Sequence, residues 1–145
     1  MLFSAAIVAS NLPVIAQNNI LKSYRWKNRL LLVFVPQVQD QRLTTIKQTL
    51  QAVECEFEDR DLLLGVLTRN APSRIGNDLI SSYDEAELRQ KYDIKSNQFA
   101  VILIGKDGKP KNQLSDVPQI EKIFAQIDTM PMRQQEMSET SNQCN

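Results

Sequence analysis

Residues 30–35 read Leu-Leu-Leu-Val-Phe-Val, an unbroken apolar run that ends at Pro36. A short apolar run without polar alternation is typical of a strand that is buried on both faces, at the centre of a sheet covered by helices. Pro36 has no backbone N–H and cannot continue the ladder of hydrogen bonds. We therefore predict a central buried strand over residues 30–35, and the remaining elements are placed around it.

Apolar residues then recur at spacings of three and four, which is typical of one face of a helix. They are Leu43, Ile46, Leu50, Val53 and Phe57. Asp40 stands where the residue that caps this helix is expected. Residues 62–67 are a second apolar strand, and residues 71–73 and 76–77 mark a loop after it. A helix between two such strands predicts a right-handed crossover and a parallel pair.

The second half of the chain predicts a helix over residues 84–92 that starts at Asp84 or Ser82, then a strand over 99–104. The turn at 106–108 leads into a return strand, which we place at the sheet edge because Pro110 cannot donate a hydrogen bond. A helix over 118–127 follows, residues 131–137 are expected to add a turn, and 138–145 are expected to be disordered. This order, β-α-β-α-β-β-α, predicts an α/β, thioredoxin-like fold: a four-stranded mixed sheet with helices on both faces.

Composition excludes several classes of function. Lysine plus arginine equals aspartate plus glutamate, 17 of each, so the basic excess that nucleic-acid binding needs is missing. The chain contains no histidine and two cysteines. Histidine-based catalysis and zinc sites made of histidine or four cysteines are therefore excluded. We predict no cofactor, no metal and no nucleic-acid partner; the partner is an unidentified protein or small molecule.

The first charged residue is Lys22, and the segment before it is mostly apolar. Val14 and Ala16 have the small-residue spacing that signal peptidase accepts, so residues 1–16 predict a signal peptide. No lysine or arginine precedes the apolar run, which leaves two alternatives: an incomplete signal peptide or a buried helix. The segment is too short for a membrane span, and we expect a periplasmic or secreted domain with no stable membrane anchor.

Four short segments carry a resemblance to a known family. They are residues 24–31 (Tyr-Arg-Trp-Lys-Asn-Arg-Leu-Leu), 59–62 (Asp-Arg-Asp-Leu), 103–108 (Leu-Ile-Gly-Lys-Asp-Gly) and Met130-Pro131-Met132-Arg133 with Glu136-Met137. Together they resemble the peroxiredoxin-like domain of unknown function that bacterial exported proteins share with vertebrate matrix proteins of the sushi-repeat and coiled-coil-domain type. The match spans about residues 20–137. It implies a thioredoxin-like fold and an extracytoplasmic setting, and it implies no established activity.

The thiol chemistry of thioredoxins is not expected here. Such a thiolate lies at the start of the first core helix, where this chain has Pro36, Gln37 and Asp40 and no cysteine. Cys55 is predicted near the C-terminal end of a helix, between Glu54 and Glu56, and both carboxylates and the helix end disfavour a thiolate. The leading hypothesis is a non-catalytic binding or interaction module. The alternative is a weak thiol peroxidase or oxidoreductase that uses Cys55, and pairing of Cys55 with Cys144 stays open.

Two groups of polar residues are candidate binding sites. At the end of the sheet that holds the thioredoxin site, the candidates are Gln37, Asp40, Arg69, Asn97 and Gln98. The alternative is a solvated loop surface in which Asp40 only caps a helix. At the opposite end, the candidates are Arg29, Arg60, Asp61, Lys106 and Asp107. The alternative there is an ion-pair network that holds the strand starts and the hairpin.

Two further features have competing interpretations. Met130, Met132 and Met137 could bind Cu(I) through their thioethers, or they could serve as flexible filler between the last helical turn and the sheet. Trp26 beside Tyr24 is expected to be a packing anchor for the N-terminal segment.

Overall fold

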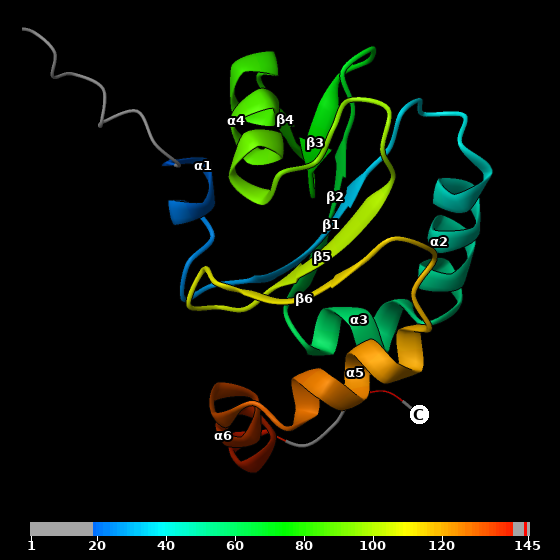
Figure 1. Cartoon of the computed structure of the whole chain (residues 1–145). Coiled ribbons are helices and arrows are strands. Elements are labelled where there is room, and N and C mark those ends of the chain that lie inside the picture. Colours follow the sequence, from blue (N-terminus) through cyan, green and yellow to red (C-terminus); the bar gives the residue numbers. More distant parts are fainter. Residues whose placement is uncertain (1–18, 141–143, 145) are drawn as a thin grey trace, which may run out of the picture.

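The predicted central strand, β1 (Arg29–Phe34), is fully buried and lies in the middle of a six-stranded sheet of order β4-β3-β2-β1-β5-β6 (Figure 1). The structure, a computed structural model, describes residues 19–140 and Cys144. The other elements, in chain order, are α1 (Asn19–Lys22), α2 (Gln41–Ala52), α3 (Glu54–Asp59), β2 (Leu62–Leu67), β3 (Ser73–Ile75), β4 (Asp78–Ile80), α4 (Ser82–Tyr92), β5 (Ala100–Ile104), β6 (Pro110–Leu114), α5 (Ile120–Asp128) and α6 (Pro131–Glu139).

Strand directions in the sheet are as predicted for the core of the fold. β1 and β2 are parallel, with Arg29 opposite Leu62 and Phe34 opposite Leu67. β5 runs antiparallel to β1, and β6 pairs antiparallel with β5 at the sheet edge. The starts of β1 and β2 therefore lie at the same end of the sheet as the β5–β6 turn.

Alternation along β1 divides the core into two layers, because successive side chains of a strand point to opposite faces. Leu31 and Val33 pack with buried residues of α2, α3 and α5. Leu30, Leu32 and Phe34 pack on the other face, where α4 and the α1 segment supply Leu88 and Leu21. Figure 1 shows α2, α3 and α5 on one side of the sheet and α4 on the other. The α/β, thioredoxin-like arrangement with helices on both faces is confirmed.

Two details of the predicted fold were wrong. The sheet has six strands rather than four, because residues 73–80 form a hairpin where a loop was expected. Gly76, at φ 59°, supplies the left-handed backbone that this two-residue turn needs. The predicted helix over 43–57 is divided at Val53, whose φ of −124° is outside the helical range, so α3 starts anew at Glu54.

The helix boundaries differ from prediction at other points. Asp40 caps α2 as predicted, accepting a hydrogen bond from the Arg42 backbone N–H at 2.9 Å. The start of α4 is capped by Ser81, ahead of the predicted Ser82 or Asp84. α6 continues through Ser138 and Glu139, which were expected to be disordered. The predicted signal peptide over residues 1–16 lies outside the described residues.

No helix in the described part of the chain is long and apolar enough to cross a lipid bilayer.

Gly65 tests the packing between the strands. It lies on β2 opposite Leu32 and Ile75, and an added Cβ would approach Leu32 Cδ2 to 2.7 Å and Ile75 Cγ1 to 3.2 Å. We expect Gly65→Ala to lower the free energy of unfolding by about 1–3 kcal/mol through overpacking, measured by urea denaturation. Gly105→Ala is the matched control, because its Cβ would chiefly meet the flexible end of Lys111. Equal effects of the two substitutions would contradict this account.

Candidate functional site

The polar candidates lie at the two ends of the sheet. We call residues 35–40, 68–72 and 95–99 the loop end, because these segments follow β1 and β2 and precede β5. We call residues 24–29, 59–62 and 104–110, together with α6, the hairpin end. Each of the two groups of candidate residues therefore lies at the end of the sheet that the predicted order of strands indicated.

Most loop-end candidates have partners within the chain. Asp40 caps α2 and also accepts from the Arg42 guanidinium at 2.8 Å, which holds the pKa of the Asp40 carboxyl below its usual range. Gln98 Oε1 accepts the Lys95 backbone N–H at 3.1 Å. Arg69 is half-exposed and lies 3.2 Å from the buried Glu85 carboxylate. Gln37 and Asn97 have exposed side chains.

The loop end is organised by Arg89, which the sequence analysis did not single out. Its guanidinium is buried and donates to the backbone carbonyls of Lys95 at 2.6 Å, Val35 at 3.2 Å and Leu67 at 3.4 Å. Its Nε pairs with Glu85. One side chain therefore ties the end of β2 to two segments of the loop end, those that follow β1 and precede β5. The spacing of Glu85 and Arg89 by four on one helix was the available signal.

The hairpin end contains a buried, charged network centred on Glu136 of α6. Arg29 is 1 % exposed and donates two hydrogen bonds of 3.1 Å to the Glu136 carboxylate. Lys106 Nζ lies 2.7 Å from Glu136 and 2.8 Å from Asp61. Three residues of the predicted cluster, Arg29, Asp61 and Lys106, therefore belong to one network. Glu136 connects them, and the sequence analysis did not include it in the cluster.

Arg60 belongs to an adjoining network instead. It pairs with Asp128 at 2.8 Å, and Arg133 pairs with Asp128 at 3.0 Å and with Asp59 at 2.7 Å. The two networks meet where Arg29 donates to the Arg60 carbonyl at 2.9 Å. The fifth predicted residue, Asp107, pairs with Lys111 at 2.8 Å within the β5–β6 hairpin.

Burial and charge act in opposite directions on the carboxylates of these networks. Burial by itself raises the pKa of Glu136, but hydrogen bonds from Arg29 and Lys106 outweigh it and lower the pKa below its usual range. The pKa of Asp128 is lowered in the same way, against burial, by Arg60 and Arg133. Both carboxylates are therefore ionised at neutral pH, and their negative charges neutralise the buried cations.

Trp26 lies at the hairpin end on a strained backbone. Its φ is 67°, a left-handed conformation that is costly for any residue with a Cβ. A 2.7 Å hydrogen bond from the Trp26 N–H to the Lys106 carbonyl holds the turn against the β5–β6 hairpin. The Trp26 side chain is 58 % exposed, so the expectation that it anchors the N-terminal segment by packing was wrong.

A hollow of about 300 Å³ lies beside Trp26. Its lining is divided between apolar and charged side chains: Trp26, Met130, Pro131 and Met132, and Arg29, Lys106, Asp107 and Lys111. Every lining residue except Lys111 belongs to the stretches that carry the family resemblance. Of the three methionines considered for copper, Met130 and Met132 line this hollow, whereas Met137 lines a different one with Thr140 and Arg133.

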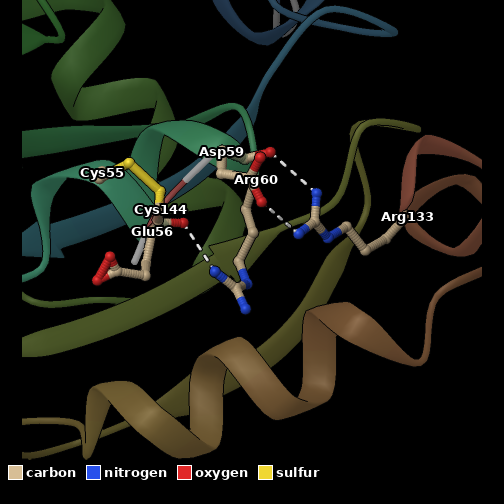
Figure 2. The surroundings of a disulfide bond; sticks show 6 residues. All are labelled: Cys55, Glu56, Asp59, Arg60, Arg133 and Cys144. Atoms are coloured by element: carbon tan, nitrogen blue, oxygen red, sulfur yellow. Dashed lines mark hydrogen bonds and ion pairs between the residues drawn. A yellow bond between two sulfur atoms is a disulfide. The ribbon is translucent and has the colours of Figure 1, made fainter. Parts of the chain in front are cut away.

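Cys55 is bonded to Cys144, with Cα atoms 5.7 Å apart. Because the helix restarts at Glu54, Cys55 lies in the first turn of α3 and not near the end of a long helix as predicted. Figure 2 shows the disulfide beside Glu56, whose carbonyl accepts from Arg60, with the Asp59–Arg133 pair further along. The bond therefore links Cys144 to α3, the helix that supplies Asp59 to the network of Arg60, Asp128 and Arg133.

Removing the central carboxylate should destabilise the fold in a pH-dependent way. Glu136→Gln leaves Arg29 and Lys106 buried without this countercharge, and we expect a loss of about 3 kcal/mol in the free energy of unfolding at neutral pH. Because the folded pKa is lowered, the stabilisation is present above the ordinary glutamate value of 4.5 and is lost as pH falls through the folded pKa. Urea denaturation at several pH values measures this.

Glu139→Gln, an exposed position on the same helix, is the matched control, with an expected change within about 0.5 kcal/mol. An equal loss in both variants, or a loss from Glu136→Gln that persists undiminished at acid pH, would contradict the central role of Glu136.

The disulfide should contribute to stability, because it restricts the unfolded chain across a sequence separation of 89 residues. Reduction is expected to lower the free energy of unfolding by about 4 kcal/mol in urea denaturation. The double variant Cys55→Ser with Cys144→Ser should match the reduced protein and show no response to reductant. Unchanged stability on reduction of the wild-type chain would contradict the prediction.

Known proteins resemble this chain over most of its described length. The Xenopus laevis protein "Sushi repeat-containing protein SRPX2" is 29% identical over 119 residues, which cover 80% of this chain and 26% of that protein. The human "Sushi repeat-containing protein SRPX" is 26% identical over 148 residues, covering 98% of this chain and 32% of that protein. The chain thus spans about a third or less of the length of these relatives.

Solved structures confirm the fold. A Plasmodium vivax 2-Cys peroxiredoxin in its reduced form superposes with a TM-score of 0.58 at 18% identity, covering 79% of this chain and 84% of that one. A Plasmodium yoelii thioredoxin peroxidase I superposes with a TM-score of 0.56 at 22% identity, covering 86% and 82%. Residues 20–136 match the family described as "Domain of unknown function (DUF4174)". The family resemblance and the thioredoxin-like fold are therefore both confirmed, and the chain belongs to the DUF4174 family.

Proposed function

We propose that this domain is a non-catalytic binding module that acts outside the cytoplasm, in the periplasm or as a secreted domain, and that its binding surface is the hollow beside Trp26. The observation that carries the proposal is Trp26 itself. The other supports are the apolar lining of the hollow and the ion-pair networks that hold its walls in place.

Stability does not account for Trp26. The left-handed backbone costs about 1–2 kcal/mol for a residue with a Cβ, and glycine would avoid that cost. A large apolar side chain offsets such a cost when it is buried, but the Trp26 side chain is mostly exposed. Strained residues of this kind cluster at binding and catalytic sites. Exposed tryptophan is also among the side chains that dominate the energy of protein interfaces. A contact with a ligand is the best explanation for this residue.

The proposed extracytoplasmic setting has two independent supports. Disulfides persist in oxidising compartments and are rare in the cytosol, and Cys55 and Cys144 are bonded in the structure. The apolar N-terminal segment of the sequence predicts an export signal. The resemblance to exported and matrix proteins agrees with both.

The proposal predicts that Trp26 contributes to binding and not to folding. Peptide and glycan libraries presented to the immobilised, oxidised chain should yield ligands for the wild type. Binding of these ligands should fall at least about tenfold with Trp26→Gly and be partly kept with Trp26→Phe. Urea denaturation followed by circular dichroism should show that Trp26→Gly leaves the free energy of unfolding unchanged or raises it by up to about 2 kcal/mol, because glycine avoids the backbone strain.

Ligands that bind wild type and Trp26→Gly equally would place the binding surface elsewhere on the domain. The alternative activity has a separate readout: consumption of peroxide by the reduced chain that is lost with Cys55→Ser would replace the binding module with a thiol enzyme. Absence of both Trp26-dependent ligands and Cys55-dependent turnover would also contradict the proposal.

A further inference from the structure

The hollow beside Trp26 combines an apolar wall with a charged one. The apolar wall is Trp26 with residues 130–132, and the side chain of Met132 is 40 % exposed. Methionine adapts its shape to irregular apolar groups, and tryptophan offers a large rigid face. A volume of about 300 Å³ is at the small end of ligand pockets and is enough for one or two bulky side chains.

The segments around the hollow are strongly basic, although the chain as a whole has no net charge. Residues 22–28 and 105–111 contain six basic side chains and one acidic side chain, Asp107. Lys106 is neutralised by Asp61 and Glu136, and Lys111 by Asp107. The remaining basic residues, Lys22, Arg25, Lys27 and Lys109, have exposed side chains and form no ion pair with the described residues.

Three basic side chains next to the apolar wall, Arg29, Arg25 and Lys111, have contacts within the chain. One of them, Arg29, also has an N–H group without an acceptor in the described part of the chain. The Arg29 Nε is buried and has no acceptor among the described residues, although both terminal nitrogens of this side chain have acceptors. Arg25 lies with its guanidinium carbon 5.8 Å from the centre of the Trp26 ring. Lys111 and its partner Asp107 each have a side chain that is 30% exposed, so solvent screens their ion pair and the exchange of Asp107 for another carboxylate costs little.

We propose that this hollow binds a protein segment in which a bulky apolar side chain stands next to one or more carboxylates. The inference rests on the proposed function and names the chemical class of the ligand. The apolar side chain packs between Trp26 and Met132, and the carboxylates face Lys109, Lys111 and Arg25. An acidic polysaccharide would satisfy the cations but would leave the apolar wall unused, so the pairing of the two walls favours a peptide.

Trp26 is the single tryptophan of the chain, so its fluorescence reports on the hollow directly. The probes are a short synthetic peptide of glutamate, leucine and glycine and two matched peptides, one with alanine for leucine and one with lysine for glutamate. We expect the glutamate–leucine peptide to shift the emission of the full, oxidised chain to shorter wavelengths. Each matched peptide should bind at least about tenfold more weakly, and added salt should weaken binding.

Variants assign the contacts. Lys109→Gln combined with Lys111→Gln should weaken the glutamate–leucine peptide about tenfold. The matched control is Lys47→Gln combined with Lys91→Gln, which changes two exposed lysines on α2 and α4, and it should leave the affinity unchanged. Met132→Ser should weaken binding of the same peptide without altering its dependence on salt.

The outcomes separate this inference from the proposed function. If library ligands depend on Trp26 but are neutral or basic, the binding module stands and the acidic class is overturned. If heparin binds more tightly than the peptide, with the same loss on lysine substitution and no loss with Met132→Ser, the ligand is a polysaccharide and the inference fails. If no probe or library ligand responds to Trp26→Gly, both fail.

Discussion

The pairing of buried Arg29 with Glu136 is the interaction on which the hairpin end depends. Arg29 opens the central strand, where the surrounding sheet and helices exclude water, and a cation without a partner in such a place costs several kcal/mol. Glu136 supplies the countercharge and shares it with Lys106 of the β5–β6 hairpin. The position of α6 follows from this requirement. Because Met130 caps α6 and Pro131 and Met132 are its first residues, the same requirement positions the apolar wall of the hollow.

A second arginine has the same structural importance at the opposite end of the sheet. Arg89 donates to carbonyls at the ends of β1 and β2 and in the segment before β5, and Glu85 balances its charge. Its guanidinium also lies 5.4 Å from the centre of the Phe34 ring. In the thioredoxin fold this end is the one that holds a reactive thiol, and here buried charge and backbone hydrogen bonds occupy it. This chain therefore shares its fold with thioredoxins but has no reactive thiol among the described residues at the corresponding end of the sheet. Widely used folds commonly host different functions in this way.

The disulfide and the strained turn at Trp26 do not belong to the ion-pair networks, but both lie next to them. The bond between Cys55 and Cys144 holds Cys144 beside α3 (Figure 2). The same helix supplies Asp59 to the ion pair with Arg133. Trp26 is held by the Lys106 carbonyl, and Lys106 itself is bound by Glu136. A rigid, ion-paired base therefore carries an exposed aromatic side chain, which is the arrangement that binding without large rearrangement requires.

Local pattern was enough to predict the strands at 30–35 and 62–67, the Asp40 cap and the edge position of the strand after the 106–108 turn. These features depend on neighbours in the sequence: unbroken apolar runs, a side chain that reaches its own helix, a proline without an N–H. The same pattern failed at Val53 and at the 73–80 hairpin, where packing against the sheet overrides weak local preference. What only the tertiary structure decided is which charges meet. Glu136, Asp128 and Arg89 are ordinary surface charges by sequence. Only docking of their helices against the ends of the sheet buries Arg89 and brings the half-buried Glu136 and Asp128 against buried cations that need a countercharge.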